Sequence, residues 1–346
     1  MRNSFYQYNF KSLTNLLALE GLSPSGASLL FNWHYKQKQV LPCTHNLALS
    51  TQAYLREHFS FDLPSIANIH QSSDQTVKFL MEMHDGQRVE TVLIPFQNKY
   101  TICLSTQVGC AMKCSFCFTG TQGLKRHLAT EEIVGQFIMA DRWLREFRPN
   151  DHQLKNIVYM GQGEPLHNFD AVKVASEIFL DQHGTSIGVQ KIAVSTAGYL
   201  PGLIRWNDEM PGVNLALSLH SPFEEKRNKL IPINQRFPLS EVINYIDTIP
   251  LKRKQYVIYE YLLIKNYNDT DIDSHATGKL LKGKQAIINL IPFNPFPGSD
   301  FERPEVKHVE QFQKILESYN LPALIRGTKG DDILAACGQL NTKTSL

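Results

Sequence analysis

The sequence predicts an α/β protein, in which six strand–helix units build a parallel sheet behind a small helical N-terminal domain. After about residue 100, short β-rich segments alternate with helical segments. The β-rich segments are almost continuously apolar, as strands buried on both faces of a parallel sheet are. Such a sheet is either flat or curled into a partial barrel, and in barrels the chemistry lies at the carboxyl ends of the strands.

Residues 1–70 form the predicted accessory domain. Apolar residues recur with helical spacing at 13–19 and 27–33, and the intervening segment, with Gly21, Pro24 and Gly26, is typical of one helix ending and another beginning. Cys43 has no recognisable role here, and we expect it to be an ordinary thiol.

Residues 71–346 form the predicted catalytic domain, which begins with a β-hairpin at about 76–95. Apolar residues alternate from Val77, Asp85-Gly86 supplies a tight turn, and a second strand follows. The expected barrel strands are 100–105, 156–160, 191–195, 213–219, 256–264 and 286–292. Between the first two, a helix carries a predicted core stripe of Ile133, Phe137, Ala140, Trp143 or Leu144, and Phe147.

Composition narrows the class of protein. No apolar segment approaches the roughly 18 residues of a membrane span, and the N-terminus lacks an apolar signal region, so we expect a cytoplasmic protein with no membrane contact. The net charge of +2 permits an anionic partner such as RNA without requiring one. Four of the six cysteines lie between positions 103 and 117, which favours metal or redox chemistry in a reducing compartment.

Cys110, Cys114 and Cys117 form a CxxxCxxC motif in the loop after the first predicted barrel strand. Three thiolates can bind three irons of a 4Fe–4S cluster and leave the fourth iron open to a substrate. The alternative is a structural zinc site, completed by Cys103 or a histidine, in a zinc-stabilised RNA-binding protein. The absence of a second cysteine pair favours the cluster.

With Phe116 before its last cysteine, the motif resembles the signature of radical S-adenosylmethionine (SAM) enzymes. The resemblance implies a partial (β/α)6 barrel, and a cluster that binds SAM and cleaves it to a 5′-deoxyadenosyl radical. It also implies that the turn from Gly161 to Pro165 receives the amino group of SAM. The turn does not match the GxGxxG motif of dinucleotide-binding proteins, because Leu166 occupies the position of the third glycine.

Further motifs resemble the RlmN/Cfr family of RNA adenosine methyltransferases over about residues 77–340. They include Val89-Glu90-Thr-Val92, Gln107-Val-Gly-Cys110, Ser195-Thr-Ala-Gly198, Ser218-Leu219-His220, Pro232-Ile-Asn234, Asn294-Pro-Phe-Pro-Gly298 and, most specifically, the segment from Gly330 through Cys337 to Leu340. The implied SAM contacts are Gly163, Glu164, Ser195, Ser218, Leu219, His220 and Asn294. The N-terminal helices resemble the family's accessory RNA-binding domain.

The resemblance implies a reaction that uses two SAM molecules and two further cysteines. Cys337 accepts a methyl group from the first SAM, and the radical made from the second removes a hydrogen from that methyl group. The carbon radical adds to the adenine, Glu90 accepts the proton, and Cys103 attacks the sulfur of Cys337. Methylated RNA is then released and a disulfide remains for reduction.

The implied substrates are 23S rRNA, methylated at carbon 2 of an adenosine, and the adenosine beside the tRNA anticodon. Gly163 to Leu166 and Arg326 to Asp332 are similar to the carbon-2 enzymes. Gly120 and Ser221-Pro222 are more similar to the carbon-8 enzymes, and Gln162 departs from both. We favour carbon 2, with carbon 8 as the alternative.

The implied partners are an electron donor such as flavodoxin or ferredoxin and a disulfide reductant, and we expect a monomer. Three basic clusters are candidate phosphate contacts or simply solvated surfaces: Lys125-Arg126-His127, Arg142 with Arg145 and Arg148, and Lys252-Arg253-Lys254.

Overall fold

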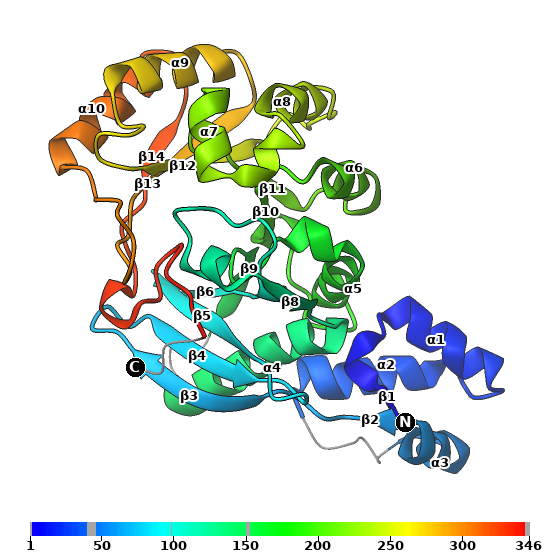
Figure 1. Cartoon of the computed structure of the whole chain (residues 1–346). Helices are drawn as coiled ribbons and strands as arrows, with labels where there is room; N and C mark the ends of the chain where they lie inside the picture. Colours follow the sequence, from blue (N-terminus) through cyan, green and yellow to red (C-terminus); the bar gives the residue numbers. More distant parts are fainter. Residues whose placement is uncertain (1, 40–45, 98, 150–152, 343–346) are drawn as a thin grey trace.

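The computed structural model describes residues 2–39, 46–97, 99–149 and 153–342. Its centre is one ten-stranded sheet with the order β14-β13-β12-β11-β10-β9-β6-β5-β4-β3 (Figure 1). The six predicted barrel strands are present as β6 (Lys99–Cys103), β9 (Leu154–Tyr159), β10 (Ile192–Thr196), β11 (Asn214–Ser218), β12 (Val257–Leu263) and β13 (Ala286–Pro292). All six run parallel, and so does a short strand that was not predicted, β14 (Ala323–Ile325). Because β14 and β3 do not pair, the barrel is open.

Helices connect the parallel strands and cover the outer face of the sheet (Figure 1). They are α4 (Thr130–Phe147), α5 (Phe169–Leu180), α6 (Leu200–Glu209), α7 (Glu224–Leu230), α8 (Leu239–Asp247), α9 (Asp271–Leu281) and α10 (Val306–Glu317). The predicted stripe on α4 is buried except at Phe147, which is 58 % exposed. Phe147 is the last residue of the helix and stacks on Trp143 at a ring-centroid distance of 5.2 Å.

An antiparallel extension continues the sheet beyond β6. The predicted hairpin is confirmed as β4 (Val77–Glu82) and β5 (Arg88–Phe96), with Lys78 opposite Val92 and Leu80 opposite Glu90. The expectation that the chain is helical to about residue 70 is wrong at its end, where β3 (Ser65–Gln71) pairs with β4. As an edge strand, β3 is largely exposed, so its apolar alternation is too weak to distinguish it from the helical region.

The N-terminal region is mostly helical, as predicted, with α1 (Phe10–Leu19), α2 (Ser25–Phe31), a π-helical turn η2 (Asn32–Lys36) and α3 (Leu49–His58). Strands β1 (Asn3–Ser4) and β2 (Phe59–Ser60) close this region, with the turn η1 (Phe5–Gln7) between β1 and α1. Its core is continuous with that of the barrel, and Lys38 pairs with Asp141 of α4 at 2.7 Å. The division into two domains therefore stays a prediction. Cys43, which we expect to be an ordinary thiol, lies outside the described residues.

Smaller elements complete the described structure. A two-stranded antiparallel sheet of β7 (Gln107–Gly109) and β8 (Leu124–His127) flanks the cysteine motif, which leads into η3 (Phe118–Gln122). Further short turns are η4 (Pro165–Asn168), η5 (Val189–Lys191), η6 (Pro232–Gln235) and η7 (Asp331–Ile333). Within the described ranges, every helix is too short or too polar to cross a membrane.

Candidate active site

A cavity of about 170 Å³ lies at the carboxyl ends of the parallel strands, where the sequence predicts the site. It receives side chains from the loops after β7, β9, β10 and β11, from the end of β12, and from the C-terminal segment. Nine predicted site residues line this cavity, which we call the cluster pocket: Cys110, Cys114, Cys117, Gly163, Glu164, Ser195, Ser218, His220 and Cys337. The structure thus brings together residues more than 200 positions apart in the sequence.

The three motif cysteines lie in a loop that β7 and β8 hold at both ends. Cys110 N–H donates to the carbonyl of Gly123 at 3.0 Å, and Cys117 N–H donates to Cys114 at 3.2 Å. Gly120 packs closely on this loop, because a Cβ there would lie 2.7 Å from the Cys114 carbonyl oxygen. Burial raises the pKa of the Cys110 thiol to about 12, and it also raises the pKa values of Cys114 and Cys117.

The donor set fits an iron–sulfur cluster. Among the residues that the structure describes, no three His, Cys, Asp or Glu side chains converge as ligands of a single metal ion. A 4Fe–4S cluster does not require that convergence, because each thiolate binds a different iron. The three cysteine thiols, whose burial opposes ionisation, need a cationic centre to become thiolates. Cys110, Cys114 and Cys117 would hold such a cluster, and its fourth iron would have no protein ligand.

Glu164 stands in the turn after β9 and faces the cluster pocket. One of its carboxylate oxygens accepts a hydrogen bond from Ala197 N–H at 2.8 Å, and the other accepts from Leu166 N–H at 3.2 Å. Burial raises its pKa to about 7, although both hydrogen bonds favour the charged form. The turn requires glycine at 163, where φ is +107° and a Cβ would lie 2.6 Å from the Cβ of Gln107.

Arg227 was not predicted as part of the site, yet it supports the pocket floor. Its fully buried guanidinium donates to the carbonyls of Ala197 at 2.8 Å, Ser218 at 2.9 Å and Leu219 at 3.1 Å, and also to the Asn234 side chain. These bonds join the chain after β10 to the chain after β11. Burial lowers the pKa of Arg227 to about 10. A basic residue within an amphipathic helix gives no sequence signal for this role.

His220 and Leu219 follow β11 and differ in their placement. His220 has a φ of +55°, packs edge-on against Phe116 at 4.6 Å, and accepts a hydrogen bond from Leu262 N–H at 3.0 Å through Nδ1. Burial lowers its pKa to about 3, so the imidazole is neutral. Leu219 does not line the pocket, and its side chain lies in the main hydrophobic core. The predicted contact between Leu219 and SAM is therefore not supported by this placement.

Cys337 reaches the cluster pocket from the segment Leu334–Asn341, which we call the Cys337 loop. The Cys337 thiol faces the cavity near Glu260 of β12, a buried carboxyl group that was not predicted as part of the site. Burial and the charge of Glu260 raise the pKa of Cys337 to about 11. Asn294, a predicted SAM contact, instead donates from its side chain to the Cys337 carbonyl at 3.2 Å and does not line the pocket.

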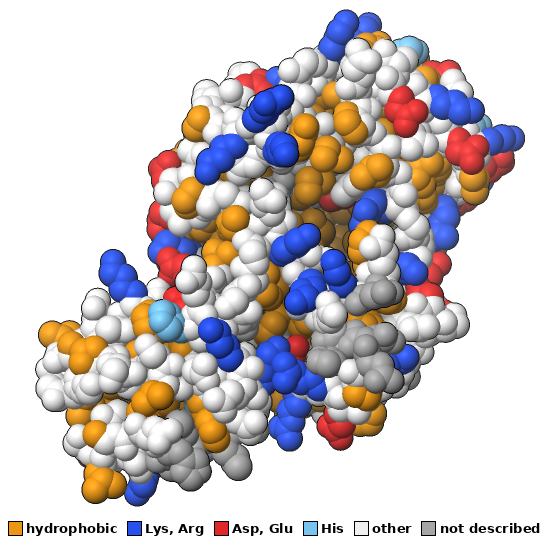
Figure 2. Space-filling view, turned by 180° about the vertical axis from the view of Figure 1, so that it is seen from behind, with side chains coloured by type: hydrophobic (Ala, Val, Ile, Leu, Met, Phe, Trp, Pro, Cys, Tyr) orange, Lys and Arg blue, Asp and Glu red, His pale blue; other side chains and the backbone are white. Residues whose placement is uncertain are grey.

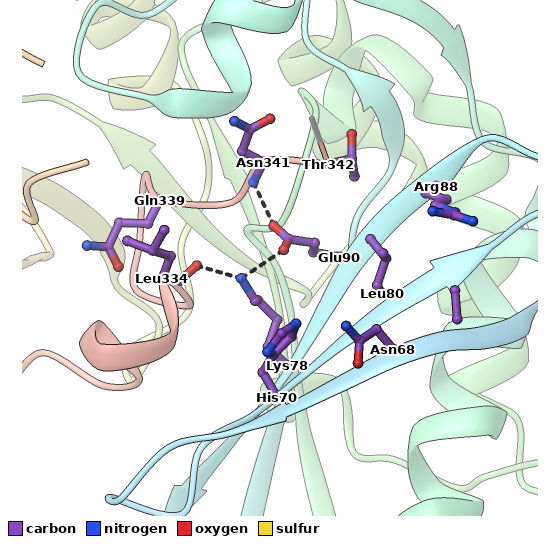
Figure 3. Close-up of a pocket in the computed structure, with 11 residues that line it drawn as sticks. Asn68, His70, Lys78, Leu80, Arg88, Glu90, Leu334, Gln339, Asn341 and Thr342 are labelled. Carbon is purple, nitrogen blue, oxygen red and sulfur yellow. Dashed lines mark hydrogen bonds and ion pairs between the residues drawn. The ribbon is translucent and has the colours of Figure 1, made fainter. Parts of the chain in front are cut away.

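Cys103 and Glu90 lie behind the Cys337 loop, outside the cluster pocket. Cys103 is buried at the end of β6 and packs with Ala335 and Leu340. Burial raises the pKa of its thiol well above the usual value, and the nearby Cys337 raises it further. Glu90 forms a buried ion pair with Lys78 at 2.9 Å and accepts a hydrogen bond from Asn341 N–H at 2.6 Å (Figure 3). Burial raises the pKa of Glu90 against the effect of Lys78.

The three basic clusters that the sequence offers as phosphate contacts lie at different ends of the barrel. Only Lys125-Arg126-His127 lies near the pocket, and Arg126 is already paired with Asp85 and Glu132, both at 2.7 Å. Lys252-Arg253-Lys254 precede β12, at the amino end of the strands, whereas the pocket lies at their carboxyl ends. The arginines of α4 likewise lie toward its C-terminal end, which leads back to the amino end of β9.

Comparison with known proteins identifies relatives across the whole chain. A family model described as the radical SAM superfamily matches residues 104–277. The dual-specificity RNA methyltransferase RlmN of Rhodospirillum rubrum is 40 % identical over 337 residues, covering 96 % of this chain and 78 % of that protein. A probable dual-specificity RNA methyltransferase RlmN of Dictyoglomus thermophilum is 38 % identical, covering 98 % and 96 %.

A solved structure also matches the fold. A radical SAM methyltransferase from Sphaerobacter thermophilus aligns with a TM-score of 0.89 at 36 % identity, covering 98 % of this chain and 99 % of that one. This match confirms the partial barrel that the sequence predicts.

Proposed function

Because the chain belongs to the RlmN family of radical SAM RNA methyltransferases, we propose that it methylates carbon 2 of an adenosine in 23S rRNA, and of the adenosine beside the tRNA anticodon. The observation that carries this proposal is the position of Cys337. Its thiol faces the same pocket as Cys110, Cys114 and Cys117, and Cys103 lies directly beneath its loop. A radical SAM enzyme without a cysteine methyl carrier would need neither Cys103 nor Cys337.

The residues around the pocket suit SAM. A bound 4Fe–4S cluster would supply the electron that cleaves SAM to a 5′-deoxyadenosyl radical. Glu164, whose pKa of about 7 leaves it readily ionised beside a cation, would receive the ammonium group of SAM. Ser195 and Ser218 offer hydroxyl groups along the same wall, and neutral His220 adds no repelling charge.

Methyl transfer to Cys337 requires its thiolate. With a pKa of about 11, the thiol is protonated at neutral pH in the free protein. A cationic sulfonium bound next to the sulfur favours loss of that proton, so SAM itself would activate the nucleophile. The thiol gives its proton to solvent, and its sulfur takes the methyl group to become a neutral thioether. The S–CH3 bond of SAM breaks, and S-adenosylhomocysteine is the leaving group.

The later steps need Cys103 and Glu90, which the loop covers in this structure. Glu90 would accept the proton that leaves carbon 2 of the adenine, but both of its oxygens are occupied, by Lys78 and by Asn341. Cys103 would attack the Cys337 sulfur, forming a disulfide and releasing the methylated RNA. We therefore infer that the Cys337 loop shifts between the first and the second half of the reaction.

The proposed RNA substrate is supported by the family and by the shape and charge of one face of the molecule. The face opposite that of Figure 1 is hollowed near its centre, with a hydrophobic floor and Lys and Arg side chains around the rim (Figure 2). An unpaired adenosine can enter such a hollow while the rim contacts phosphates. The N-terminal helices would extend the RNA contact. A flavodoxin- or ferredoxin-type donor and a disulfide reductant would serve a cytoplasmic monomer.

Methylation at carbon 8 is the second candidate, favoured by Gly120 and by Ser221-Pro222. Gln162, which departs from both patterns, accepts a hydrogen bond from Glu90 N–H at 2.8 Å and so lies beneath the proposed proton acceptor. The alternative of a zinc-stabilised RNA-binding protein loses its basis, since the chain belongs to a radical SAM enzyme family.

Mass spectrometry of 23S rRNA and tRNA tests the proposal, after incubation with cluster-loaded enzyme, SAM and reductant. We expect 2-methyladenosine; 8-methyladenosine would establish the second candidate instead. Cys103→Ala should accumulate a covalent protein–RNA adduct, whereas Cys337→Ala should give neither adduct nor product. Cys43→Ala is the matched cysteine control and should react like the unchanged chain. Full activity of Cys337→Ala would refute the mechanism.

A further inference from the structure

The Cys337 loop is attached at both ends to one buried ion pair. Lys78 Nζ donates to the carbonyl of Leu334 at 3.2 Å, and the Glu90 carboxylate accepts from Asn341 N–H at 2.6 Å. The two side chains contact each other at 2.9 Å, and both are only about 5 % exposed. Figure 3 shows the pair between the two ends of the loop, beneath a cavity of about 150 Å³.

Strand register explains why these side chains meet. Lys78 stands opposite Val92 and Leu80 opposite Glu90, so Lys78 and Glu90 are diagonal neighbours on one face of β4 and β5. Cys103 stands opposite Val92 across the β5–β6 pair and therefore shares that face. The loop lies over this face, where Ala335 and Leu340 pack on Cys103.

We propose that Lys78 is a positioning residue: together with Glu90 it fixes both ends of the Cys337 loop, which keeps Cys337 in the cluster pocket and Cys103 covered. The relevance for catalysis rests on the proposed function, in which these two cysteines act in different steps. Bonds from the cluster side hold the middle of the loop, since Phe118 N–H donates to the Gly338 carbonyl at 2.7 Å. At the ends, the ion pair acts together with bonds from Ala335 N–H to the Gly330 carbonyl at 2.8 Å and from the Thr119 hydroxyl to the Leu340 carbonyl at 2.7 Å. The ion pair joins the two ends to each other.

Removing the Lys78 ammonium acts on both ends at once. The Leu334 carbonyl loses its charged donor, and Glu90 is left as a buried carboxylate without a counter-charge, which favours its protonated form. A neutral carboxyl group is a weaker acceptor for the Asn341 amide. The loop should therefore open more often, and Cys103 should become accessible.

Labelling of Cys103 measures this opening in cluster-loaded protein without SAM or RNA. Iodoacetamide is the probe, and peptide mass mapping quantifies its reaction at each cysteine. For Lys78→Met we expect Cys103 to react about tenfold faster, equivalent to about 1.4 kcal/mol in the opening equilibrium. The rate at Cys103 is compared with that in the unchanged chain under the same conditions. Hydrogen exchange should accelerate in peptides spanning 334–341 and stay unchanged in those from β10 to β13.

Three further variants complete the test. Lys78→Arg keeps the charge and should restore protection, whereas Glu90→Gln should loosen the loop less than Lys78→Met because its amide oxygen still accepts from Asn341. Arg88→Met is the matched control, because Arg88 lines the same cavity and pairs with Glu82 at 2.7 Å without touching the loop. It should leave Cys103 labelling within about twofold of the unchanged chain.

Unchanged labelling in Lys78→Met, or an equal increase in Arg88→Met, would overturn the proposal. Faster exchange in β10 to β13 as well would show a general loss of stability and would overturn it too. Neither readout depends on methylation, so a failure of the proposed function would leave this result intact.

Discussion

Replacing Arg227 by methionine should destabilise the protein strongly, because three carbonyls lose a charged donor and two of them have Arg227 as their side-chain donor. Arg227 is fully buried and donates to the carbonyls of Ala197, Ser218 and Leu219. The Leu219 carbonyl also accepts from Ser221 N–H at 2.7 Å, so the carbonyls of Ala197 and Ser218 carry the loss. A buried acceptor left unpaired costs about 1 kcal/mol at the lower end of the usual range, so these two carbonyls give a loss of about 2 kcal/mol. That is a large part of the roughly 5–15 kcal/mol by which folded proteins are stable.

Urea denaturation of cluster-loaded protein, followed by circular dichroism under anaerobic conditions, measures this loss. Arg205→Met is the matched control, since Arg205 also makes ion pairs, with Asp170 and Glu209 at 2.8 Å, but its side chain is 43 % exposed. Exposed pairs contribute about 1 kcal/mol or less. Arg227→Lys should fall between the two methionine variants, because one ammonium group cannot reach all three carbonyls. A loss in Arg227→Met no larger than that in Arg205→Met would refute the reasoning.

Three further predictions concern the pocket. The affinity for SAM should rise with pH through about 7, where Glu164 ionises, and Glu164→Gln should flatten this dependence in equilibrium binding; a profile unaffected by the substitution would contradict the assignment. Gly163→Ala should cost about 1–3 kcal/mol or more in urea denaturation. Gly298→Ala, at a φ of +86° but with open space around it, should cost less; equal costs would show that the contact with Gln107 is unimportant. Glu260→Gln removes a negative charge near Cys337, so the pH profile of Cys337 alkylation should shift to lower pH, and an unmoved profile would place the two groups too far apart to interact.

The barrel was predictable because its signals are local. Each parallel strand is a short apolar segment between helices, and this pattern survives in the sequence without knowledge of the partners. Strands β3 and β14 escaped prediction for a physical reason: one is an exposed edge strand and the other has only three residues. Neither buries enough apolar surface to impose a clear period on its sequence.

The site was only partly predictable. Cys110, Glu164 and Ser218 line one pocket, because each lies at or just after the end of a strand near the carboxyl end of the barrel. Their roles in that pocket stay predictions. Asn294 and Leu219 also follow strands. The Asn294 side chain, however, donates to the Cys337 carbonyl, and the Leu219 side chain packs in the hydrophobic core. The end of a strand predicts proximity to the site and not the direction of a side chain.

Lys78 shows where sequence reasoning stops. Strand alternation alone places the Lys78 side chain on the face of β4 opposite to that of Phe79 and Met81. The register between β4 and β5 then shows that Glu90 lies on the same face as Lys78. Its contact with the Leu334 carbonyl depends on an irregular segment more than 250 residues away. No periodicity encodes that contact, so only the structure could supply it.

The charges of the pocket favour the order of events that the proposed reaction needs. Glu164 and Glu260 are buried carboxyl groups with pKa values of about 7 and 6, and each ionises more readily when a cation lies beside it. SAM brings a sulfonium, but once its methyl group has moved to Cys337 the product is a neutral thioether. The attraction between Glu260 and the sulfonium is then lost, whereas the ammonium group at Glu164 is kept, and the first product still occupies the place that the second SAM would take. In the proposed reaction, this difference in charge would favour exchange of the demethylated product for a second SAM in the same pocket.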